Sequence, residues 1–357
     1  MFQLHYQNRI YSHAQDFQNP EETMPDFVQA AFSFCEAWLS GEEIYIQETS
    51  GSTGSPKKLS IHRNQMIASA EATGSFLQAS ANWKLLCCLN PAYIAGKMML
   101  VRAMVWNCEI ELVAPRTNPF TESFFTTEYD FVAMVPLQVE TILEDPSSAE
   151  LLKTIQNLII GGAPISQKLQ KQLVNKNINA FQTFGMTETA SHFALAEITE
   201  KELIYQALPG VQIGINSHQL LWVRSAMSGP DPIQTNDEID LVSENSFRWL
   251  GRSDFVINSG GVKLHPELIE QKAELQIHLF FPDVPFFFGS LPDDSLGQKL
   301  TLFLETESSN EKKAKDLKDS LKSSLDRFEV PKEIVFKKRF HRTSNGKLDR
   351  LKTINEL

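Results

Sequence analysis

The segment from Thr49 to Lys57 has the composition of a loop that holds phosphate. It reads TSGSTGSPK and combines hydroxyl side chains with two glycines and a lysine. Glycines let backbone N–H groups approach an anion closely, hydroxyls add donors, and lysine supplies compact positive charge. The spacing does not fit a Walker A loop, and a flexible linker is the alternative. The Pro-Lys-Lys run directly before an expected strand favours the phosphate loop, whose candidates are Thr49, Ser50, Gly51, Ser52, Thr53, Gly54 and Lys57.

A second group of polar side chains follows an apolar run that ends near Phe184. Thr187 offers a hydroxyl donor and Glu188 a hard carboxylate. Loops beyond the carboxyl ends of strands are where α/β sheets bind ligands, and this pair suits a phosphate with its Mg²⁺. Taken alone, the same residues also fit the start of a helix.

Arg102 lies in an otherwise apolar helix expected over residues 95–106. A buried guanidinium needs an anionic partner. That partner is either a structural Asp or Glu, which is the commoner case, or a carboxylate of a substrate.

Short apolar runs alternate with helical patterns over the first two thirds of the chain, which is typical of α/β layers. From about Gly214 to Leu250 short strands with turn signals predict an all-β section, and the remainder predicts a small α+β unit with helices over residues 266–275 and 311–328. We therefore expect an α/β protein with a large multilayer domain that includes a β-rich section, followed by a small mobile α+β domain. The expected bounds are 1–251 for the large domain, 252–254 for a hinge and 255–357 for the small domain.

Composition excludes several classes of protein. The 357 residues carry a net charge of −11, which disfavours nucleic acid and anionic membranes as partners. Hydrophobic residues make up 42% of the sequence, as in ordinary folded domains. The sequence has neither the pattern of a secretory signal peptide nor a stretch of about 18 apolar residues, the length of a membrane span. The spacing of the four cysteines fits buried reduced thiols in a cytoplasmic protein. Assembly into a homo-oligomer is compatible with the sequence. Residues 331–350 nevertheless hold seven Lys or Arg against two acidic residues, a local cationic segment that suits a small polyanion.

Six segments, in their order along the chain, resemble the motifs of the adenylate-forming superfamily, which includes acyl-CoA synthetases, firefly luciferase and peptide-synthetase adenylation domains. TSGSTGSPK is similar to the phosphate-binding loop of that family, GGAP at 161–164 to its adenine-side segment, and FGMTET to its Y-G-x-T-E motif, with Phe184 in place of tyrosine. Thr235-Asn236-Asp237 resembles the ribose motif T-G-D, with Asn replacing Gly. GRSDFVINSGGVKLHPELIE is similar to the interdomain hinge motif, and RTSNGKLDR to the terminal motif that bears the catalytic lysine.

The resemblance implies an enzyme that activates a carboxylate with ATP and Mg²⁺ and transfers the acyl group to a thiol such as CoA. It assigns β- and γ-phosphate contacts to the loop at 49–57, α-phosphate contact to Thr187 and Mg²⁺ to Glu188. It also makes Lys347 the catalytic lysine that bridges the carboxylate and the α-phosphate, and Asp254 the hinge about which the small domain swings. The remaining nucleotide contacts that it implies are Gly161, Gly162, Ala163, Phe184, Gly185, Asp237 and Arg252. No general base is required, so we expect the eight histidines to be structural or on the surface.

The local patterns around Asn90–Gly96 and Thr187–Ser191 most resemble the o-succinylbenzoate-CoA ligases of menaquinone synthesis, whose substrate is a dicarboxylate. We expect Arg102 to bind its aromatic carboxylate, with Lys97 or Ser191 assisting. Another acid-CoA or carrier-protein ligase of the same superfamily is the alternative, and a nucleotide-binding regulator without turnover is a third. Longer relatives carry a substantial leader before the phosphate loop, so part of the acyl pocket wall is expected to be missing or rebuilt here.

Overall fold

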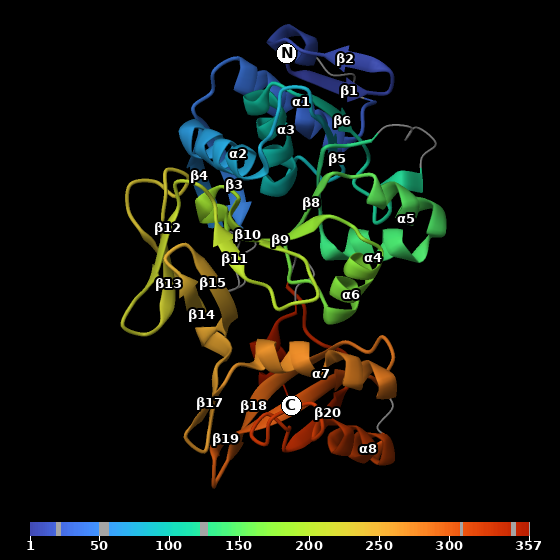
Figure 1. Ribbon diagram of the computed structural model, residues 1–357, viewed down its shortest axis with the longest axis vertical. Helices are drawn as coiled ribbons and strands as arrows, with labels where there is room; N and C mark the ends of the chain where they lie inside the picture. The colour runs from blue at the N-terminus through green and yellow to red at the C-terminus, as the bar shows by residue number, and fades with distance from the viewer. Residues whose placement is uncertain (19–22, 50–56, 122–127, 308–309, 344–347, 357) are drawn as a thin grey trace.

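The computed structural model describes residues 1–18, 23–49, 57–121, 128–307, 310–343 and 348–356 (Figure 1). Within these ranges the side chains of Glu48, Thr49 and Lys57 are not described. The fold is α/β, as the alternation of apolar runs and helical patterns predicts.

One large sheet of thirteen strands organises the amino-terminal two thirds of the described chain, which we call the large domain. Its order is β12-β13-β14-β15-β11-β10-β9-β8-β7-β5-β6-β1-β2. The half that is mainly parallel contains β1 (Gln3–Tyr6), β2 (Arg9–Tyr11), β5 (Lys84–Cys87), β6 (Glu109–Leu112), β7 (Phe131–Met134), β8 (Asn157–Ile160) and β9 (Ala180–Gly185). The antiparallel half contains β10 (His192–Glu197), β11 (Tyr205–Ala207), β12 (Gln212–Ile215), β13 (Leu220–Arg224), β14 (Ile233–Ser243) and β15 (Ser246–Arg252).

Two hydrophobic cores cover the two faces of the parallel strands. Because side chains alternate along a strand, Leu85 joins one core and Leu86 the other. The first core includes α1 (Asp26–Leu39), α2 (Arg63–Leu77) and α3 (Ile94–Trp106), and the second includes α4 (Pro136–Glu144), α5 (Pro146–Lys153) and α6 (Gln167–Asn175) (Figure 1). Adjacent Cys87 and Cys88 also face opposite cores, and all four cysteines are buried and free, as expected.

A separate hairpin frames the expected phosphate loop. Strands β3 (Ile44–Thr49) and β4 (Lys57–His62) pair antiparallel, with Thr49 opposite Lys57. Residues 50–56 connect their ends and lie outside the described residues. The described residues also form four short 3₁₀ turns: η1 (Ala14–Phe17), η2 (Pro119–Thr121), η3 (Thr187–Thr189) and η4 (Ser253–Phe255).

The remaining residues form a small α+β domain below the large sheet (Figure 1). Its five-stranded sheet contains β16 (Ile257–Ser259), β17 (Val262–Leu264), β18 (Phe286–Asp293), β19 (Gly297–Glu305) and β20 (Glu333–Lys337). Helix α7 (Pro266–Phe280) lies along the side that faces the large domain, and α8 (Glu311–Leu321) and α9 (Arg350–Asn355) complete it. The sheets and cores thus separate between Arg252 and Ile257, while rotation about a hinge there stays a prediction.

Two helix bounds differ from the sequence prediction. The helix expected over 266–275 continues to Phe280, because Ala273 and Ile277 extend its buried face. The helix expected over 311–328 ends at Leu321. There the hydroxyl of Ser323 donates to the carbonyl of Ser320 at 2.6 Å, and the N–H of Ser324, which would bond this carbonyl in a continued helix, donates to Leu321 instead. In the described part of the chain, no helix is both long enough and apolar enough to cross a membrane.

Candidate active site

The expected adenine-side segment and the Thr-Glu turn follow neighbouring parallel strands. Gly161, Gly162 and Ala163 come directly after β8, and Thr187 follows β9. Buried Gln182 on β9 holds the loop that follows β8, because its side-chain amide donates to the carbonyls of Ile160 (3.1 Å) and Ala163 (3.2 Å) and its oxygen accepts from the N–H of Ile165 (2.9 Å). Both loops therefore lie at one edge of the sheet, where α/β sheets bind ligands.

Gly185 lets the chain turn back closely after β9. A Cβ at this position would lie 2.3 Å from the Cα of His192 on the pairing strand β10. The turn η3 that follows leaves Thr187 half-buried and Glu188 exposed, and Thr189 closes it by donating to the carbonyl of Met186 (2.9 Å). Strand β4 contacts η3, which brings one side of the β3–β4 hairpin beside Thr187 and Glu188.

An aromatic cluster connects Phe184 with the expected ribose-binding residue. The Phe184 ring packs edge-on against Phe193 and Phe247, with Trp249 6.5 Å away. The indole Nε1 of Trp249 donates to Oδ1 of Asp237 at 3.0 Å. Burial raises the pKa of the Asp237 carboxyl, and the indole hydrogen bond opposes this shift. Phe184 and Asp237, which lie 53 positions apart in sequence, thus belong to one contiguous unit.

The expected hinge residues form a polar cluster next to Asp237. Asp237 pairs with Arg252 across β14 and β15. The guanidinium of Arg252 lies 2.5 Å from a carboxylate oxygen of Asp254, and the Asn236 amide lies 3.4 Å from the same group. Two residues of the proposed nucleotide site and the expected hinge residue therefore interact directly.

Arg102 is the largest fully buried side chain in the described structure, with 1% of its surface exposed. Its Nη2 donates to the hydroxyl of Ser191 at 2.9 Å and lies 3.5 Å from Nδ1 of His192. No Asp or Glu side chain among the described residues forms an ion pair with it, and its Nε has no hydrogen-bond partner there. Burial lowers the pKa of the guanidinium to about 9. The guanidinium is therefore a buried positive charge that is solvated only by neutral groups.

Hydrogen-bond polarity fixes how His192 supports this guanidinium. Because arginine can only donate, Nδ1 of His192 must accept, so the ring proton resides on Nε2. Nε2 lies 3.1 Å from the hydroxyl of Thr73, which donates onward to the carbonyl of Ser69 at 2.9 Å. Burial and, to a lesser extent, the charge of Arg102 hold the pKa of His192 well below its usual value. The imidazole therefore stays neutral and connects Arg102 on α3 to Thr73 on α2.

The other two expected substrate contacts differ from each other in placement. Ser191 is partly exposed and accepts a hydrogen bond from Arg102. Lys97 instead donates to the side-chain oxygen of Gln47 on β3 at 2.9 Å, and burial lowers its pKa. The structure thus brings Ser191 to Arg102 and directs Lys97 toward the hairpin.

Part of the expected site lies outside the described residues, namely Ser50, Gly51, Ser52, Thr53 and Gly54 in 50–56 and Lys347 in 344–347. The cationic segment around Lys347 is described in part, and several of its charges have structural partners. Arg342 pairs with Glu305 (2.6 Å), and Arg350 binds Glu270 through two 2.7 Å hydrogen bonds. Part of the local cationic charge among the described residues is therefore neutralised within the small domain.

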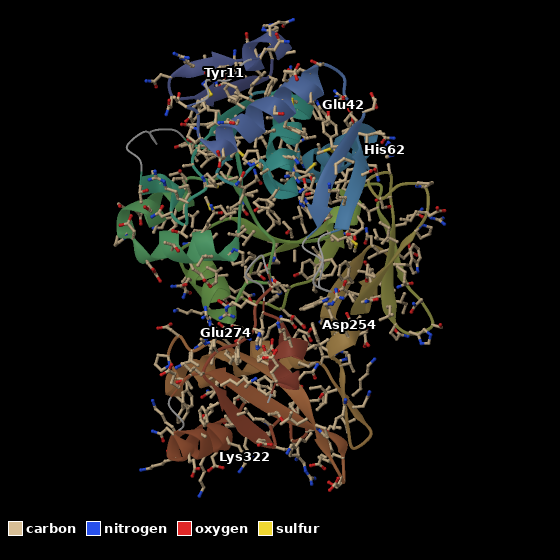
Figure 2. The ribbon with its side chains drawn as sticks, turned by 180° about the vertical axis from the view of Figure 1, so that it is seen from behind. Tyr11, Glu42, His62, Asp254, Glu274 and Lys322 are labelled. Atoms are coloured by element: carbon tan, nitrogen blue, oxygen red, sulfur yellow. The ribbon has the colours of Figure 1, made fainter. Side chains whose placement is uncertain are left out.

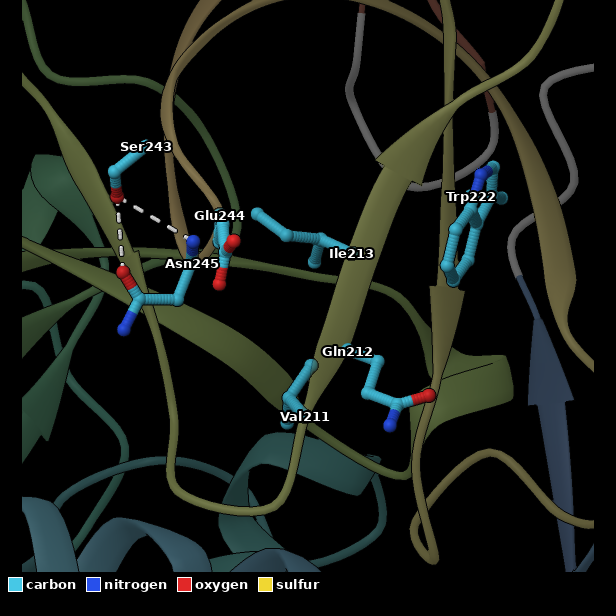
Figure 3. Close-up of a pocket in the computed structure, with 7 residues that line it drawn as sticks. All are labelled: Val211, Gln212, Ile213, Trp222, Ser243, Glu244 and Asn245. Carbon is cyan, nitrogen blue, oxygen red and sulfur yellow. Dashed lines mark hydrogen bonds between the residues drawn. The ribbon is translucent and has the colours of Figure 1, made fainter.

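A pocket of about 570 Å³ lies away from these residues, on the antiparallel half of the sheet (Figure 3). In it, the hydroxyl of Ser243 donates to Oδ1 of Asn245 at 2.9 Å and accepts the Asn245 backbone N–H at 3.4 Å. None of its lining residues belongs to the expected site: Val211, Gln212, Ile213, Trp222, Ser243, Glu244 and Asn245.

Sequence reasoning missed the supporting residues Gln47, Thr73, Gln182, His192 and Trp249. Each is a single polar or aromatic residue outside any motif, and its contacts depend on strand register and helix packing. Only His192 carried a usable signal, since it directly follows Ser191 in the Thr-Glu-Thr-Ala-Ser-His run.

Comparison with known proteins gives the context of this geometry. A probable 2-succinylbenzoate-CoA ligase from Mycobacterium tuberculosis (strain CDC 1551 / Oshkosh) is 28% identical over 266 residues, covering 71% of this chain and 68% of the relative. The 2-succinylbenzoate-CoA ligase of Bacillus cereus (strain Q1) is 24% identical over 374 residues, covering 95% of this chain and 74% of the relative.

Solved structures agree. An acyl-CoA synthetase (AMP-forming)/AMP-acid ligase II-like protein from Dyadobacter fermentans DSM 18053 is 35% identical, with a TM-score of 0.64 over 97% of this chain and 98% of that one. The o-succinylbenzoate CoA synthetase of Bacillus subtilis shares the fold, with a TM-score of 0.71 at 20% identity over 86% of this chain and 68% of that one. The family model for AMP-binding enzymes matches residues 8–219, which is more than half of the chain, and the protein therefore belongs to the AMP-binding enzyme family.

Proposed function

We propose that this protein is an ATP-dependent acid-thiol ligase that converts o-succinylbenzoate to o-succinylbenzoyl-CoA through an acyl-adenylate. In the first half-reaction a substrate carboxylate oxygen bonds to the α-phosphorus of ATP and pyrophosphate leaves. In the second, the thiol of CoA attacks the acyl carbon and AMP leaves with the electron pair of the broken bond. Relatives named 2-succinylbenzoate-CoA ligase and the family membership support this reaction class.

The environment of Arg102 is the observation that carries the choice of substrate. A guanidinium that is 1% exposed and has no carboxylate partner among the described side chains is poised to bind an anion. A carboxylate placed beside partly exposed Ser191 would reach Arg102 and receive charge-assisted hydrogen bonds. A substrate with a second carboxylate, distant from the one that reacts, satisfies this requirement.

The nucleotide roles follow from the loops at the edge of the sheet. We propose that Gly161, Gly162, Ala163, Phe184 and Gly185 contact the adenine side of ATP. Asp237, held by the Trp249 indole, and Arg252 would fix the ribose. Thr187 would donate to the α-phosphate, and the loop from Thr49 to Lys57 would hold the β- and γ-phosphates.

The described residues also fit a magnesium ion. Glu188 is exposed at the edge of the sheet, and no ion pair involves its carboxylate among the described side chains. Oxygen ligands of this kind suit Mg²⁺, which supplies charge neutralisation for the phosphates when bound.

Lys347 would add positive charge where the carboxylate meets the α-phosphate. Because one site must serve both half-reactions, we propose that the small domain rotates about residues 252–254 between them, in the cytoplasm where ATP and CoA are available.

Acid-dependent exchange of pyrophosphate into ATP, measured across a panel of carboxylic acids, tests the proposal. We expect exchange with o-succinylbenzoate, followed by thioester and AMP formation when CoA is added. Exchange with fatty acids or simple benzoates instead would indicate another acyl- or aryl-CoA ligase. Adenylation without transfer to CoA would indicate a carrier-protein ligase, and a complete lack of acid-dependent exchange would contradict enzymatic function.

A further inference from the structure

Glu274 is a buried carboxylate that crosses the boundary between the two domains. It lies on α7 of the small domain and is 7% exposed. One of its oxygens accepts the backbone N–H of Gln167 at 2.6 Å, and the other lies 3.4 Å from the N–H of Lys168. These are the first two N–H groups of α6 in the large domain. Glu274 of the small domain therefore caps a helix of the large domain.

The cap supplements the one that α6 provides for itself. The hydroxyl of Ser166 accepts the N–H of Leu169 at 3.0 Å, which leaves the N–H groups of Gln167 and Lys168 without an intradomain side-chain acceptor among the described contacts. A carboxylate facing helix N–H groups is stabilised by charge-assisted hydrogen bonds and by the helix dipole. Separation of the domains would return both partners to water.

Position decides which interdomain contacts survive a rotation. Two other interdomain polar contacts involve residues closer in sequence to the expected hinge: Lys263 with Glu238 at 2.5 Å and the N–H of Arg252 with Glu267 at 3.3 Å. Glu274 is eight residues farther along α7 than Pro266, about 12 Å along the helix axis. Figure 2 shows Asp254 and Glu274 at opposite ends of the domain boundary. A rotation about residues 252–254 therefore breaks the Glu274 contact, because a displacement of about 1 Å removes a hydrogen bond of this length.

From these observations we infer that Glu274 is a positioning residue, which holds the small domain in the orientation seen here and thereby favours the adenylation half-reaction. In this orientation Glu267, on the same helix as Glu274, accepts the N–H of Arg252 at 3.3 Å. Burial raises the pKa of the Glu267 carboxyl, and the charge of nearby Arg350, three positions after Lys347, opposes this shift. This inference rests on the proposed function, in which Lys347 acts during adenylation and is withdrawn for thiol transfer.

The test separates the two half-reactions in Glu274→Ala and Glu274→Gln. Loss of one charge-assisted contact lowers the ratio of this orientation to all others roughly tenfold or more, so acid-dependent pyrophosphate exchange should fall about twofold or more for Glu274→Ala. Thioester formation from supplied acyl-adenylate and CoA should be unchanged or faster, and Glu274→Gln, which keeps an acceptor oxygen, should lie between. Asp283→Asn is the matched control, since Asp283 also approaches α6 at Lys168 (4.0 Å) but is exposed, and both rates should stay at wild-type values. An equal loss in both half-reactions, or unchanged exchange, would overturn the role of Glu274.

A second readout does not depend on turnover. Because all four native cysteines are buried, fluorophores can be attached at Lys171→Cys on α6 and Lys315→Cys on α8. Energy transfer between them should report one dominant separation in the otherwise wild-type protein and a shifted or broader distribution with Glu274→Ala. An unchanged distribution refutes the positioning role. If the wild-type protein lacks acid-dependent exchange but Glu274→Ala still shifts the energy-transfer distribution, the proposed function is refuted. The role of Glu274 in holding the domain orientation then still stands.

Discussion

Replacing Arg102 with methionine should make the protein more stable and a worse enzyme. Methionine retains an unbranched side chain of similar length and removes the charge. Burial shifts the guanidinium pKa from 12.5 to about 9. At about 1.4 kcal/mol per pH unit, the charged form costs the folded protein at most about 5 kcal/mol.

The losses on substitution are smaller than this cost. The guanidinium lies 5.6 Å from the Phe131 ring, a contact worth about 0.5 to 2 kcal/mol. Ser191 and His192 retain their mutual contact at 3.3 Å, so neither becomes isolated. We therefore expect Arg102→Met to raise the free energy of unfolding by roughly 1 to 3 kcal/mol, and Tm by several degrees. Denaturant unfolding and calorimetry measure both quantities.

Catalysis should change in the opposite direction. Hydrogen bonds to a charged group contribute about 1.5 to 3 kcal/mol, so kcat/KM for o-succinylbenzoate should fall up to about a hundredfold. The analogue 4-oxo-4-phenylbutanoate lacks the ring carboxylate, and its kcat/KM should hardly change. Arg63→Met removes a guanidinium that stacks 4.0 Å above Trp38, outside the site, and serves as the control. Strong destabilisation by Arg102→Met with equal losses for the two acids would refute the reasoning and make Arg102 structural.

Three further predictions concern the supporting structure. Because His192 is neutral in the folded protein, the free energy of unfolding should fall by about 1.4 kcal/mol per pH unit as pH drops below about 6.5. Urea titrations should show that His192→Asn removes this slope. The same slope in wild type and His192→Asn would show that the folded ring protonates normally. Gly185→Ala places a Cβ 2.3 Å from the Cα of His192, so it should cost about 1 to 3 kcal/mol and reduce pyrophosphate exchange, and wild-type exchange would contradict the close approach. Glu270→Ala removes the hydrogen-bonded carboxylate partner of Arg350 and should lower the free energy of unfolding by about 3 to 5 kcal/mol, measured by thermal unfolding. The double variant Glu270→Ala with Arg350→Met should recover much of this loss. Equal stability of the single and double variants would refute a buried ion pair.

The sequence was sufficient to predict the layered α/β architecture, because the runs 131–134 in β7 and 158–160 in β8 are continuously apolar and fit strands covered on both faces. It also predicted the burial of Arg102, since the surrounding helix is apolar. It could not predict the partners of Arg102. Ser191 is 89 residues away, and the Thr73–His192 contact spans 119 residues. Such contacts depend on how α2 and α3 pack against β10, and no local pattern encodes that packing.

Arg102 and Glu274 share one physical property, although they lie in different domains. Each is a buried charge whose described partners are neutral dipoles: hydroxyl and imidazole for Arg102, and peptide N–H groups for Glu274. Neutral dipoles solvate a buried charge only in part, so its energy remains sensitive to what approaches or departs. For Arg102 the sensitive event is the arrival of a substrate anion, and for Glu274 it is the departure of α6. The poorly compensated charges thus lie where the proposed catalytic cycle requires substrate binding or domain rotation. A fully paired charge such as Arg350 with Glu270 lies inside the small domain, which must stay rigid during that rotation.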